Sequence, residues 1–432
     1  MNPAEAPREV VPGPAFERRG GELYCEQAAL AEIARRHGTP TYVYSRRAIE
    51  QAYAAYANAL AGRHALVCYA IKANSNLAIL DLLGRAGAGF DIVSGGELAR
   101  VLAAGGDPRR IVFSGVGKLD PEIEAALRAN ILCFNVESQA ELAQVARVAA
   151  GLGRRAPISL RVNPDVDAKT HPYISTGLRE NKFGVAYEDA LSLYKAAAAD
   201  RHLDVVGIDC HIGSQITEVA PYLDAAERIL DLVDDLARAG IGLHHIDFGG
   251  GLGIRYREET PPSAAELIAA LLDRVDRRGH GDRLLMFEPG RSLVGNAGVL
   301  LTKVNLLKSA ATRNFAVVDA AMNDLIRPTL YGAWMDVQPV VRREAPSTRY
   351  DVVGPVCESG DWLARDRDLA IAPGDLLAIL GAGAYAMSMA SNYNSRARAA
   401  EVIVDGGSDY CVRRRERIED LYAGESLLPP KG

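Results

Sequence analysis

The sequence contains nothing that ties it to a membrane or to a framework of disulfides. Its 432 residues include no apolar run long enough to span a bilayer. The N-terminal stretch MNPAEAPREVVPGPAF lacks the apolar core of a secretory signal. The six cysteines are far apart and form no C-x-x-C pair, so no metal site is expected. We therefore expect a cytoplasmic protein in a reducing compartment, in which several thiols serve as small core residues.

A strong net charge and long charged tracts are also missing. The net charge is −6, and basic runs such as residues 413–415 are short and local. A solvated surface explains such runs better than a binding patch, so we expect neither a nucleic-acid partner nor a membrane partner. Hydrophobic residues make up 48% of the chain and charged residues 24%, as in ordinary globular proteins. The length exceeds what one small core needs and predicts two domains.

Between about residues 46 and 300, short apolar runs alternate with helical stretches rich in alanine and leucine, such as the helix predicted over 222–239. Eight of these runs are typical of buried parallel strands: 65–71, 89–93, 110–114, 131–136, 158–162, 205–212, 244–249 and 284–290. Eight β/α units over roughly 255 residues match an α/β fold of the (β/α)8 TIM barrel type. A doubly wound open sheet is the alternative.

The ends of the eight runs favour the barrel. Nearly every run ends in polar or charged residues, and the C-terminal ends of barrel strands converge on one mouth. These residues are Lys72, Asp91, Ser114, Glu137, Asn163, His211, Asp247 and Glu288.

Beyond residue 300 the pattern changes to short strand-like runs separated by turns, which predicts a second, mostly β domain. We expect an N-terminal tail and a segment packing on the β domain over residues 1–45, the barrel over 46–300 and the β domain over 301–432. The first 20 residues are expected to form a loose tail. The run TYVYS at 41–45 either pairs into the β domain or leads into the barrel.

Lys72 ends the first barrel run, in the stretch YAIKAN. A lysine at a barrel mouth is partly desolvated, which lowers its pKa and makes the neutral amine available for a Schiff base. The same position suits a lysine whose stem packs on the core while its ammonium reaches water. Position alone favours the second interpretation, and the surrounding motifs reverse that preference.

Two glycine-bearing loops, Asp247–Gly253 and Glu288–Arg291, follow the seventh and eighth runs. TIM barrels usually hold a phosphate at these two loops, because glycine lets backbone N–H groups approach phosphate oxygens. Glu288 beside such a site could keep a pyridine nitrogen protonated, which stabilises a carbanion next to an imine. A simple turn and a surface carboxylate are the alternatives.

Other candidates are weaker when each is taken alone. His211, in HIGSQ after the sixth run, could stack on a cofactor ring, although a lone histidine is more often structural. Ser214 could bind the phosphate, and Asn163 could face the same cavity. In the second domain Arg327 could join Arg291 in clamping a carboxylate.

Cys357 and Glu358 lie together in one glycine-dense loop of the second domain. Glu358 could hold an ammonium group, and Cys357 could protonate a carbanion. Taken alone, each residue would be interpreted as a structural or a surface residue, but glycine-dense loops in a β domain often form functional sites.

Nine segments spread from residue 69 to residue 396 resemble those of bacterial diaminopimelate decarboxylases. They are YAIKAN, FDIVSGGEL, HPYISTGLRENKFG, CHIGSQ, DFGGGLG, EPGRSLVG, RPTLYGAW, GPVCESGDWLA and GAGAYAMSMASNYNSR. One departure is visible: this family often has histidine after RPxLYGAW, where this chain has Met335. That position carries none of the roles below.

The resemblance implies an alanine-racemase-like barrel with a C-terminal β domain, assembled as a homodimer with shared active sites. The residues implied to hold pyridoxal 5′-phosphate are Lys72, Asp91, His211, Ser214, Gly250, Glu288, Pro289, Gly290, Arg291 and Tyr385. Those implied to hold the substrate are Arg291, Arg327, Tyr331, Glu358 and Tyr385. Lys72 forms the Schiff base. Cys357 and Glu358 come from the partner subunit, and Cys357 is the implied proton donor.

The implied activity is that of a carboxy-lyase, which converts meso-2,6-diaminopimelate to L-lysine and CO2 in the last step of lysine biosynthesis. The charged residues favour this substrate, because its zwitterionic distal end needs both arginines and Glu358. Ornithine would leave buried arginines without a partner, at roughly 1–3 kcal/mol or more. The alternatives are a decarboxylase of ornithine, arginine or carboxynorspermidine, an amino-acid racemase, and a non-catalytic cofactor-binding protein. Glu288 argues against a racemase, since racemases of this fold resemble one another in placing an arginine at the pyridine nitrogen.

Overall fold

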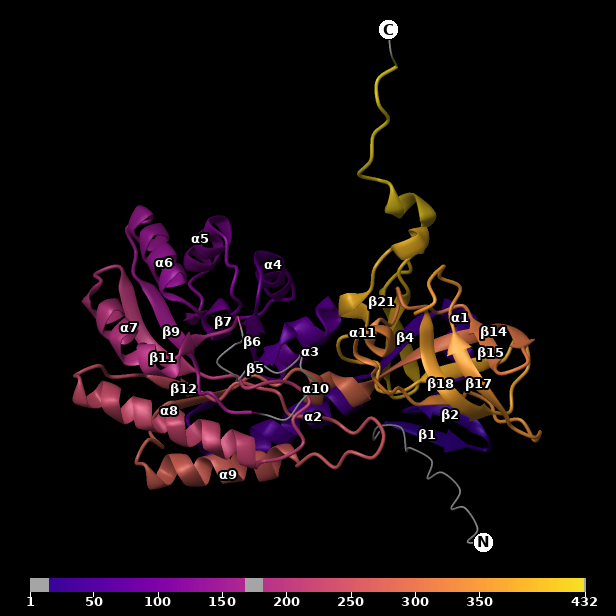
Figure 1. The fold of residues 1–432 in the computed structure, drawn as a ribbon, viewed down its shortest axis with the longest axis horizontal. Helices are drawn as coiled ribbons and strands as arrows, with labels where there is room; N and C mark the ends of the chain where they lie inside the picture. Colours follow the sequence, from indigo (N-terminus) through magenta and orange to yellow (C-terminus); the bar gives the residue numbers. More distant parts are fainter. Residues whose placement is uncertain (1–14, 168–181, 431–432) are drawn as a thin grey trace. The chain divides into compact units, whose positions relative to one another are not determined.

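The computed structural model describes residues 15–167 and 182–430, which form two compact units (Figure 1). The barrel unit consists of residues 50–255 and 259–294. The β unit combines the chain up to residue 49 with residues 256–258 and the chain from residue 295 onward. The barrel sequence is therefore inserted between two parts of the β unit.

The barrel unit contains eight parallel strands. They are β5 (Ala65–Ala70), β6 (Gly89–Ile92), β7 (Ile111–Phe113), β8 (Cys133–Val136), β9 (Ala156–Asn163), β11 (Leu203–Asp209), β12 (His245–Asp247) and β13 (Leu284–Phe287). Each strand pairs with the next in this order, and β13 pairs with β5, so the sheet closes. The short β10 (Val185–Ala186) adds to β9. The predicted barrel is confirmed, and the open-sheet alternative is wrong.

Helices surround the strands of the barrel unit (Figure 1). They are α3 (Leu77–Arg85), α4 (Gly95–Ala103), α5 (Asp120–Ala129), α6 (Gln139–Gly151), α7 (Tyr187–Ala199), α8 (Ala220–Arg238), α9 (Ala264–Arg277) and the short α10 (Arg291–Val294). The helix predicted over 222–239 is α8, whose apolar face is buried. At the start of α9, Ser263 and Glu266 form a capping box that satisfies backbone N–H groups.

The barrel interior changes from apolar to polar along its strands. Leu66, Cys68, Val112, Cys133 and Met286 form one buried cluster. Because side chains alternate along a strand, the residue two positions later points to the same side. Polar residues stand at those positions, with Ser114 after Val112, Asn135 after Cys133 and Glu288 after Met286. The strand ends therefore carry polar groups directly above an apolar layer.

The β unit is built on a second sheet. Its strands are β4 (Thr41–Ser45), β14 (Gly298–Ser309), β15 (Asn314–Val318), β16 (Val337–Pro339), β17 (Thr348–Val353), β18 (Trp362–Leu369), β19 (Leu376–Ile379), β20 (Ala400–Asp405) and β21 (Ser408–Arg413). Strand β4, the TYVYS run, lies between β14 and β20. Of the two alternatives for this run, pairing into the β domain is the one observed. A short helix, α11 (Arg327–Tyr331), also belongs to this unit.

The start of the described chain differs from the expected loose tail. Phe16–Arg19 form strand β1, which pairs with β2 (Glu22–Cys25), and β3 (Ala28–Ala29) completes a small sheet before α1 (Leu30–His37) and α2 (Arg46–Ala59). Phe16 is buried in a cluster with Leu23 and Val43. The prediction for residues 16–19 was wrong because a four-residue strand is too short to show an alternating pattern.

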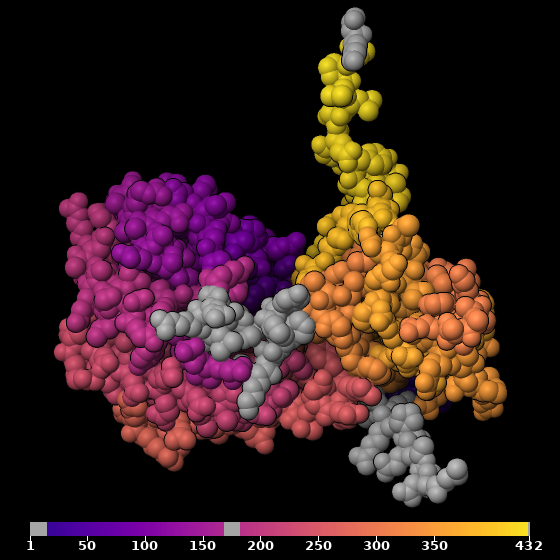
Figure 2. All heavy atoms as spheres, viewed as in Figure 1, coloured from indigo at the N-terminus to yellow at the C-terminus, as the bar shows by residue number. Residues whose placement is uncertain are grey.

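Beyond residue 421 the chain projects as a narrow extension from its own unit, with Leu427 and Leu428 almost fully exposed (Figure 2). Among the described residues, no helix is both long enough and apolar enough for a membrane crossing.

Candidate active site

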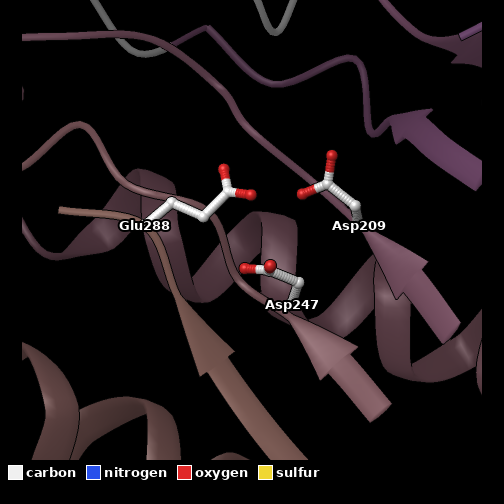
Figure 3. A group of neighbouring side chains, drawn as sticks. All are labelled: Asp209, Asp247 and Glu288. Carbon is white, nitrogen blue, oxygen red and sulfur yellow. The ribbon is translucent and has the colours of Figure 1, made fainter. Parts of the chain in front are cut away.

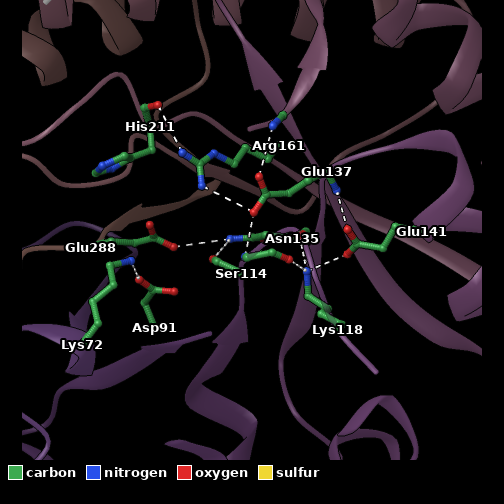
Figure 4. A network of polar contacts seen from close by, with 12 residues as sticks. Lys72, Asp91, Ser114, Lys118, Asn135, Glu137, Glu141, Arg161, His211 and Glu288 are labelled. Atoms are coloured by element: carbon green, nitrogen blue, oxygen red, sulfur yellow. Dashed lines mark hydrogen bonds and ion pairs between the residues drawn. The ribbon is translucent and has the colours of Figure 1, made fainter. Parts of the chain in front are cut away.

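Lys72 lies in a short 3-10 turn, Ile71–Ala73, immediately after β5. Its Nζ atom donates to Asp91 Oδ2 at 2.7 Å (Figure 4). Asp91 is fully buried, whereas the Lys72 side chain is 35% exposed. The other Asp91 oxygen is buried and accepts no hydrogen bond from the described residues. Asp91 thus holds an accessible amine at the mouth of the barrel.

Lys118 provides a contrast within the same unit. Its side chain is fully buried, and its ammonium donates to Gly115 O at 2.8 Å, Asn135 O at 2.9 Å and Glu141 Oε1 at 2.6 Å. These three acceptors match the three N–H groups of a protonated lysine. Lys118 is therefore a structural cation that ties the ends of β7 and β8 to α6. Of these two lysines, only Lys72 has a side chain open to a reactant.

The glycine-rich loop after β12 packs closely on its neighbours. A Cβ atom on Gly250 would lie 2.0 Å from Glu288 O, and one on Gly251 would lie 2.2 Å from Gly213 O. Gly249 and Gly251 also adopt positive φ angles of 65° and 102°. Only glycine fits such positions without strain. The loop therefore brings the segments that follow β11, β12 and β13 into close backbone contact.

The loop after β13 places the positively charged side chain of Arg291 beside the glycine-rich loop. Arg291 is 6% exposed, and its Nη2 atom donates to Ser214 Oγ at 3.1 Å. Pro289 O accepts from Ala70 N at 3.1 Å, and a Cβ on Gly290 would lie 3.2 Å from Ala70 Cβ. These contacts hold the loop against the end of β5, beside Lys72. A hydroxyl, a guanidinium and a glycine loop together suit a phosphate group.

Three buried carboxyl groups face one another at the ends of β11, β12 and β13 (Figure 3). Each of Asp209, Asp247 and Glu288 has an oxygen within 4.8 Å of the others. Burial, followed by repulsion from Asp247, raises the pKa of Glu288 well above its usual range. Burial also raises the pKa of Asp209, to about 7. Like charges this close cannot all ionise in a dry interior, so the cluster retains protons near neutral pH.

His211 follows β11 and accepts the Gly250 backbone N–H at its Nδ1 atom, over 3.2 Å. Burial lowers the pKa of His211 well below its usual value, and the positive charges of Arg161 and Lys72 act in the same direction. The ring is therefore a neutral imidazole, which suits stacking on an aromatic ring. Asn163, the last residue of β9, accepts the backbone N–H of Asp165 at 3.0 Å.

The β unit carries the other predicted residues. Arg327 begins α11 and is 6% exposed. Its Nη1 atom donates to Tyr256 Oη at 3.0 Å, and its guanidinium lies 4.8 Å from the centre of the Tyr256 ring. Tyr331 ends the same helix, and Tyr385 adopts a left-handed φ of 53°. A buried arginine held by a tyrosine is prepared to bind an anion.

Cys357 and Glu358 lie together in the loop between β17 and β18, and both are exposed. Cys25, Cys68, Cys133 and Cys210 are buried, and burial raises the pKa of each of these thiols. Cys357 is thus one of two cysteines, with Cys411, that solvent can reach. Its position suits a residue that exchanges a proton.

Comparison with known proteins agrees with this chemistry. Residues 46–295 match the family described as pyridoxal-dependent decarboxylase, pyridoxal binding domain. The chain is 63% identical to diaminopimelate decarboxylase of Pseudomonas aeruginosa over 96% of this chain and 99% of that protein. This chain belongs to the diaminopimelate decarboxylase family.

Solved structures of family members share the whole fold. One is diaminopimelate decarboxylase from Helicobacter pylori complexed with L-lysine, with a TM-score of 0.88 and 44% identity over 91% of this chain and 98% of that chain. Another, from M. jannaschii in co-complex with L-lysine, has a TM-score of 0.92 and 37% identity, covering 97% of this chain and 99% of that chain. The predicted family, enzyme class and decarboxylase activity are confirmed.

Pyridoxal 5′-phosphate, the predicted cofactor, is confirmed by the family match, and the residues of the barrel mouth fit it. Lys72 offers an amine for the aldehyde, and the buried Glu288 offers a carboxyl group for the ring nitrogen. Gly250 allows close backbone approach, and Arg291 supplies the positive charge for a phosphate. In kind and charge, these groups are compatible with a bound pyridoxal 5′-phosphate.

Sequence reasoning missed several buried polar residues around this mouth (Figure 4). Asn135 Nδ2 donates to Ser114 Oγ at 3.1 Å and to Glu288 Oε1 at 3.3 Å. Arg161 forms an ion pair with Glu137 at 3.5 Å. Asn135 and Arg161 interrupt the apolar runs ILCFNV and ISLRV, and a polar residue inside a buried strand was the available signal.

Part of one resembling segment, HPYISTGLRENKFG, falls on residues 171–181, which lie outside the described residues. The barrel-mouth residues are brought together within the barrel unit. Arg327, Tyr331, Cys357, Glu358 and Tyr385 belong to the β unit.

Proposed function

We propose that this chain removes the carboxyl group at the D centre of meso-2,6-diaminopimelate as CO2 and releases L-lysine, the last step of lysine biosynthesis. The observation that carries the proposal is the Lys72–Asp91 pair at a barrel mouth that also contains Glu288 and a glycine loop. The 63% identity to the Pseudomonas aeruginosa enzyme supports the same substrate. The two relatives solved with L-lysine support the same product.

When bound at this site and protonated on its ring nitrogen, pyridoxal 5′-phosphate would stabilise negative charge at the substrate carbon that loses CO2. Glu288 would hold the proton on that nitrogen. Asn135 Nδ2, at 3.3 Å, orients one of its oxygens for this contact. The surrounding apolar strands exclude water, which strengthens the interaction.

Lys72 has a second task once the substrate amine has replaced it. Asp91 Oδ2, which lies 2.7 Å from Nζ in this structure, would keep the released Lys72 amine near the reaction centre. From there Lys72 would displace the product. Arg291 and Ser214 would bind the phosphate throughout, so that the reacting carbon stays aligned.

The β unit would complete the site, with Cys357 and Glu358 supplied by the partner subunit of a homodimer. The Cys357 thiol would donate the proton that replaces the carboxyl group. Glu358 would bind the distal ammonium of the substrate, and Arg327 its distal carboxylate. Tyr331 and Tyr385 would line the same site. The homodimer and a cytoplasmic location remain predictions.

Charge balance supports diaminopimelate over a simpler diamino acid. The distal end of diaminopimelate is a zwitterion, so it satisfies Arg327 and Glu358 at once. Ornithine carries only the distal ammonium. It would bring no carboxylate to the buried guanidinium of Arg327.

A substrate panel tests this proposal. Purified enzyme loaded with pyridoxal 5′-phosphate is incubated separately with meso-diaminopimelate, ornithine, arginine and lysine, and CO2 release is followed. We expect meso-diaminopimelate to be the best substrate and L-lysine to accumulate in step with CO2. Faster turnover of ornithine would contradict the distal-end argument, and racemised substrate without CO2 would contradict the reaction class.

A further inference from the structure

The loop that carries Cys357 and Glu358 is anchored at both ends. Asp361 accepts the backbone N–H groups of Met322 and Val356, each at 2.7 Å. Thr329 Oγ1 donates to Gly360 O at 2.6 Å. These bonds fix the base of the loop but do not reach the side chain of Glu358.

A separate segment, the 3-10 turn Tyr393–Ser395, contacts the tip of this loop. Tyr393 Oη donates to Glu358 Oε1 at 2.6 Å. The next residue, Asn394, accepts the backbone N–H of Cys357 at its Oδ1 atom, over 2.9 Å. One segment therefore holds the side chain of Glu358 and the backbone of Cys357 at the same time.

The backbone of the turn is unusual in a way that agrees with this role. Asn394 and Ser395 adopt left-handed φ angles of 55° and 53°, which side chains other than glycine rarely take. Such conformations persist where surrounding contacts over-determine them. Ser391 N donates to Asn323 O at 2.9 Å, and Asn392 Nδ2 donates to Glu416 Oε2 at 2.6 Å, so the start of the turn is fixed.

The Tyr393–Glu358 bond lies at the surface, since Tyr393 is 43% exposed. Exposed polar pairs contribute little to folding stability, so its importance lies in where it points the carboxylate. The hydrogen bond to Glu358 raises the pKa of Tyr393, because a phenolate beside a carboxylate is disfavoured. Tyr393 therefore keeps its proton and remains a donor.

We propose that Tyr393 is a positioning residue that orients the Glu358 carboxylate toward the distal ammonium of the substrate, and so helps to select amino acids with an amine at both ends. It acts through Glu358 and does not contact the substrate. The inference rests on the proposed function, because it takes the role of Glu358 from there.

The test compares two ligands that differ by one amino group. In L-lysine the distal ammonium is the α-ammonium, because the other amine comes from the decarboxylated D centre. 6-Aminohexanoate is L-lysine without this α-ammonium. Dissociation constants are measured on the holoenzyme from the change in cofactor absorbance. Tyr393→Phe should weaken lysine binding by about fivefold to tenfold, the size expected for losing one ordinary hydrogen bond, and 6-aminohexanoate binding by less than about twofold.

Equal weakening of both ligands would overturn the inference, since it would indicate general damage to the site. Unchanged binding of both ligands would overturn it as well. As a matched control, Tyr410→Phe removes a hydroxyl from another exposed tyrosine of the β unit and should leave the ratio of the two constants unchanged.

Glu358→Gln separates this inference from the proposed function. If Glu358→Gln loses the preference for lysine over 6-aminohexanoate and Tyr393→Phe keeps this preference, only the inference fails. If Glu358→Gln itself keeps the preference, the assigned role of Glu358 fails, and the inference fails with it. The double variant should bind lysine no more weakly than Glu358→Gln alone, and an additional loss would mean that Tyr393 does not act through Glu358.

Discussion

The barrel mouth and the loop bearing Cys357 and Glu358 are held in place in different ways. At the mouth, Asp91 is 0% exposed, Glu288 5% and Arg291 6%, and packed strands support them. In the β unit, Cys357 and Glu358 are exposed and depend on a few hydrogen bonds from Tyr393 and Asn394. The proposed cofactor residues of the mouth are thus held by packing within one unit, whereas the proposed proton donor and the proposed distal-end residue depend on surface contacts. Changes at the mouth should therefore abolish turnover, and changes in the loop should alter its rate and selectivity.

The largest effect is expected for Lys72→Ala. Without the amine that carries the cofactor, kcat should fall by about a thousandfold or more. Steady-state CO2 release measures the loss. The matched variant is Lys118→Met, which should lower the melting temperature because it leaves Glu141 buried without its cation. It should still carry cofactor on Lys72. A Lys72→Ala enzyme with near-normal turnover would contradict the difference drawn between the two lysines.

Cys357→Ala should cost less, about a hundredfold in kcat, because water can supply the proton more slowly than a positioned thiol. Cofactor absorbance should be unchanged, since the barrel mouth is intact. Mixing Lys72→Ala and Cys357→Ala subunits tests the shared site. Hybrid dimers combine one intact Lys72 with one intact Cys357, so some activity should return. No recovery after verified subunit exchange would contradict the homodimeric site.

Gly250→Ala should weaken cofactor binding by about tenfold or more, because its Cβ would lie 2.0 Å from Glu288 O and force the two loops apart. Titration of the apoenzyme with pyridoxal 5′-phosphate measures this affinity. Gly242→Ala is the control: this glycine belongs to the same unit, and its added Cβ would meet no atom within 4 Å. Equal effects of both changes would mean that the close approach at Gly250 has no special role.

The smallest effect concerns stability and pH. Burial raises the pKa of Asp209 to about 7 in the folded chain, compared with 3.8 for an unperturbed aspartate. A raised pKa means that the folded state binds the proton more tightly, so stability is full below about pH 4 and declines as pH rises through 7. Asp209→Asn removes this penalty and should raise the melting temperature at pH 8, by roughly 2–4 °C for each kcal/mol recovered.

The gain from Asp209→Asn should shrink toward pH 5, where wild-type Asp209 is already protonated in the folded state. Thermal unfolding at several pH values gives this trend directly. A variant that is less stable than wild type at every pH would contradict the account of the three carboxyl groups.

The sequence allowed much of the barrel to be predicted, because strands buried on both faces appear as continuous apolar runs. Their polar ends predicted that Lys72, Asp91 and Glu288 lie at one mouth of the barrel, where the structure places them (Figure 4). Residues 16–19 were misjudged because their strand is four residues long. The Tyr393–Glu358 bond could not be predicted, since it joins loops 35 residues apart that no sequence period relates. Long-range pairs of this kind depend on the folded backbone.

The central claim is that Lys72, and not the neighbouring buried Lys118, carries the cofactor. Reduction of the purified holoenzyme with borohydride, followed by peptide mass mapping, tests it most directly, since reduction fixes an imine as a stable amine. We expect one added pyridoxyl phosphate mass on the peptide containing Lys72 and none in Lys72→Ala. Label on Lys118 or on another lysine, with Lys72 unmodified, would contradict it.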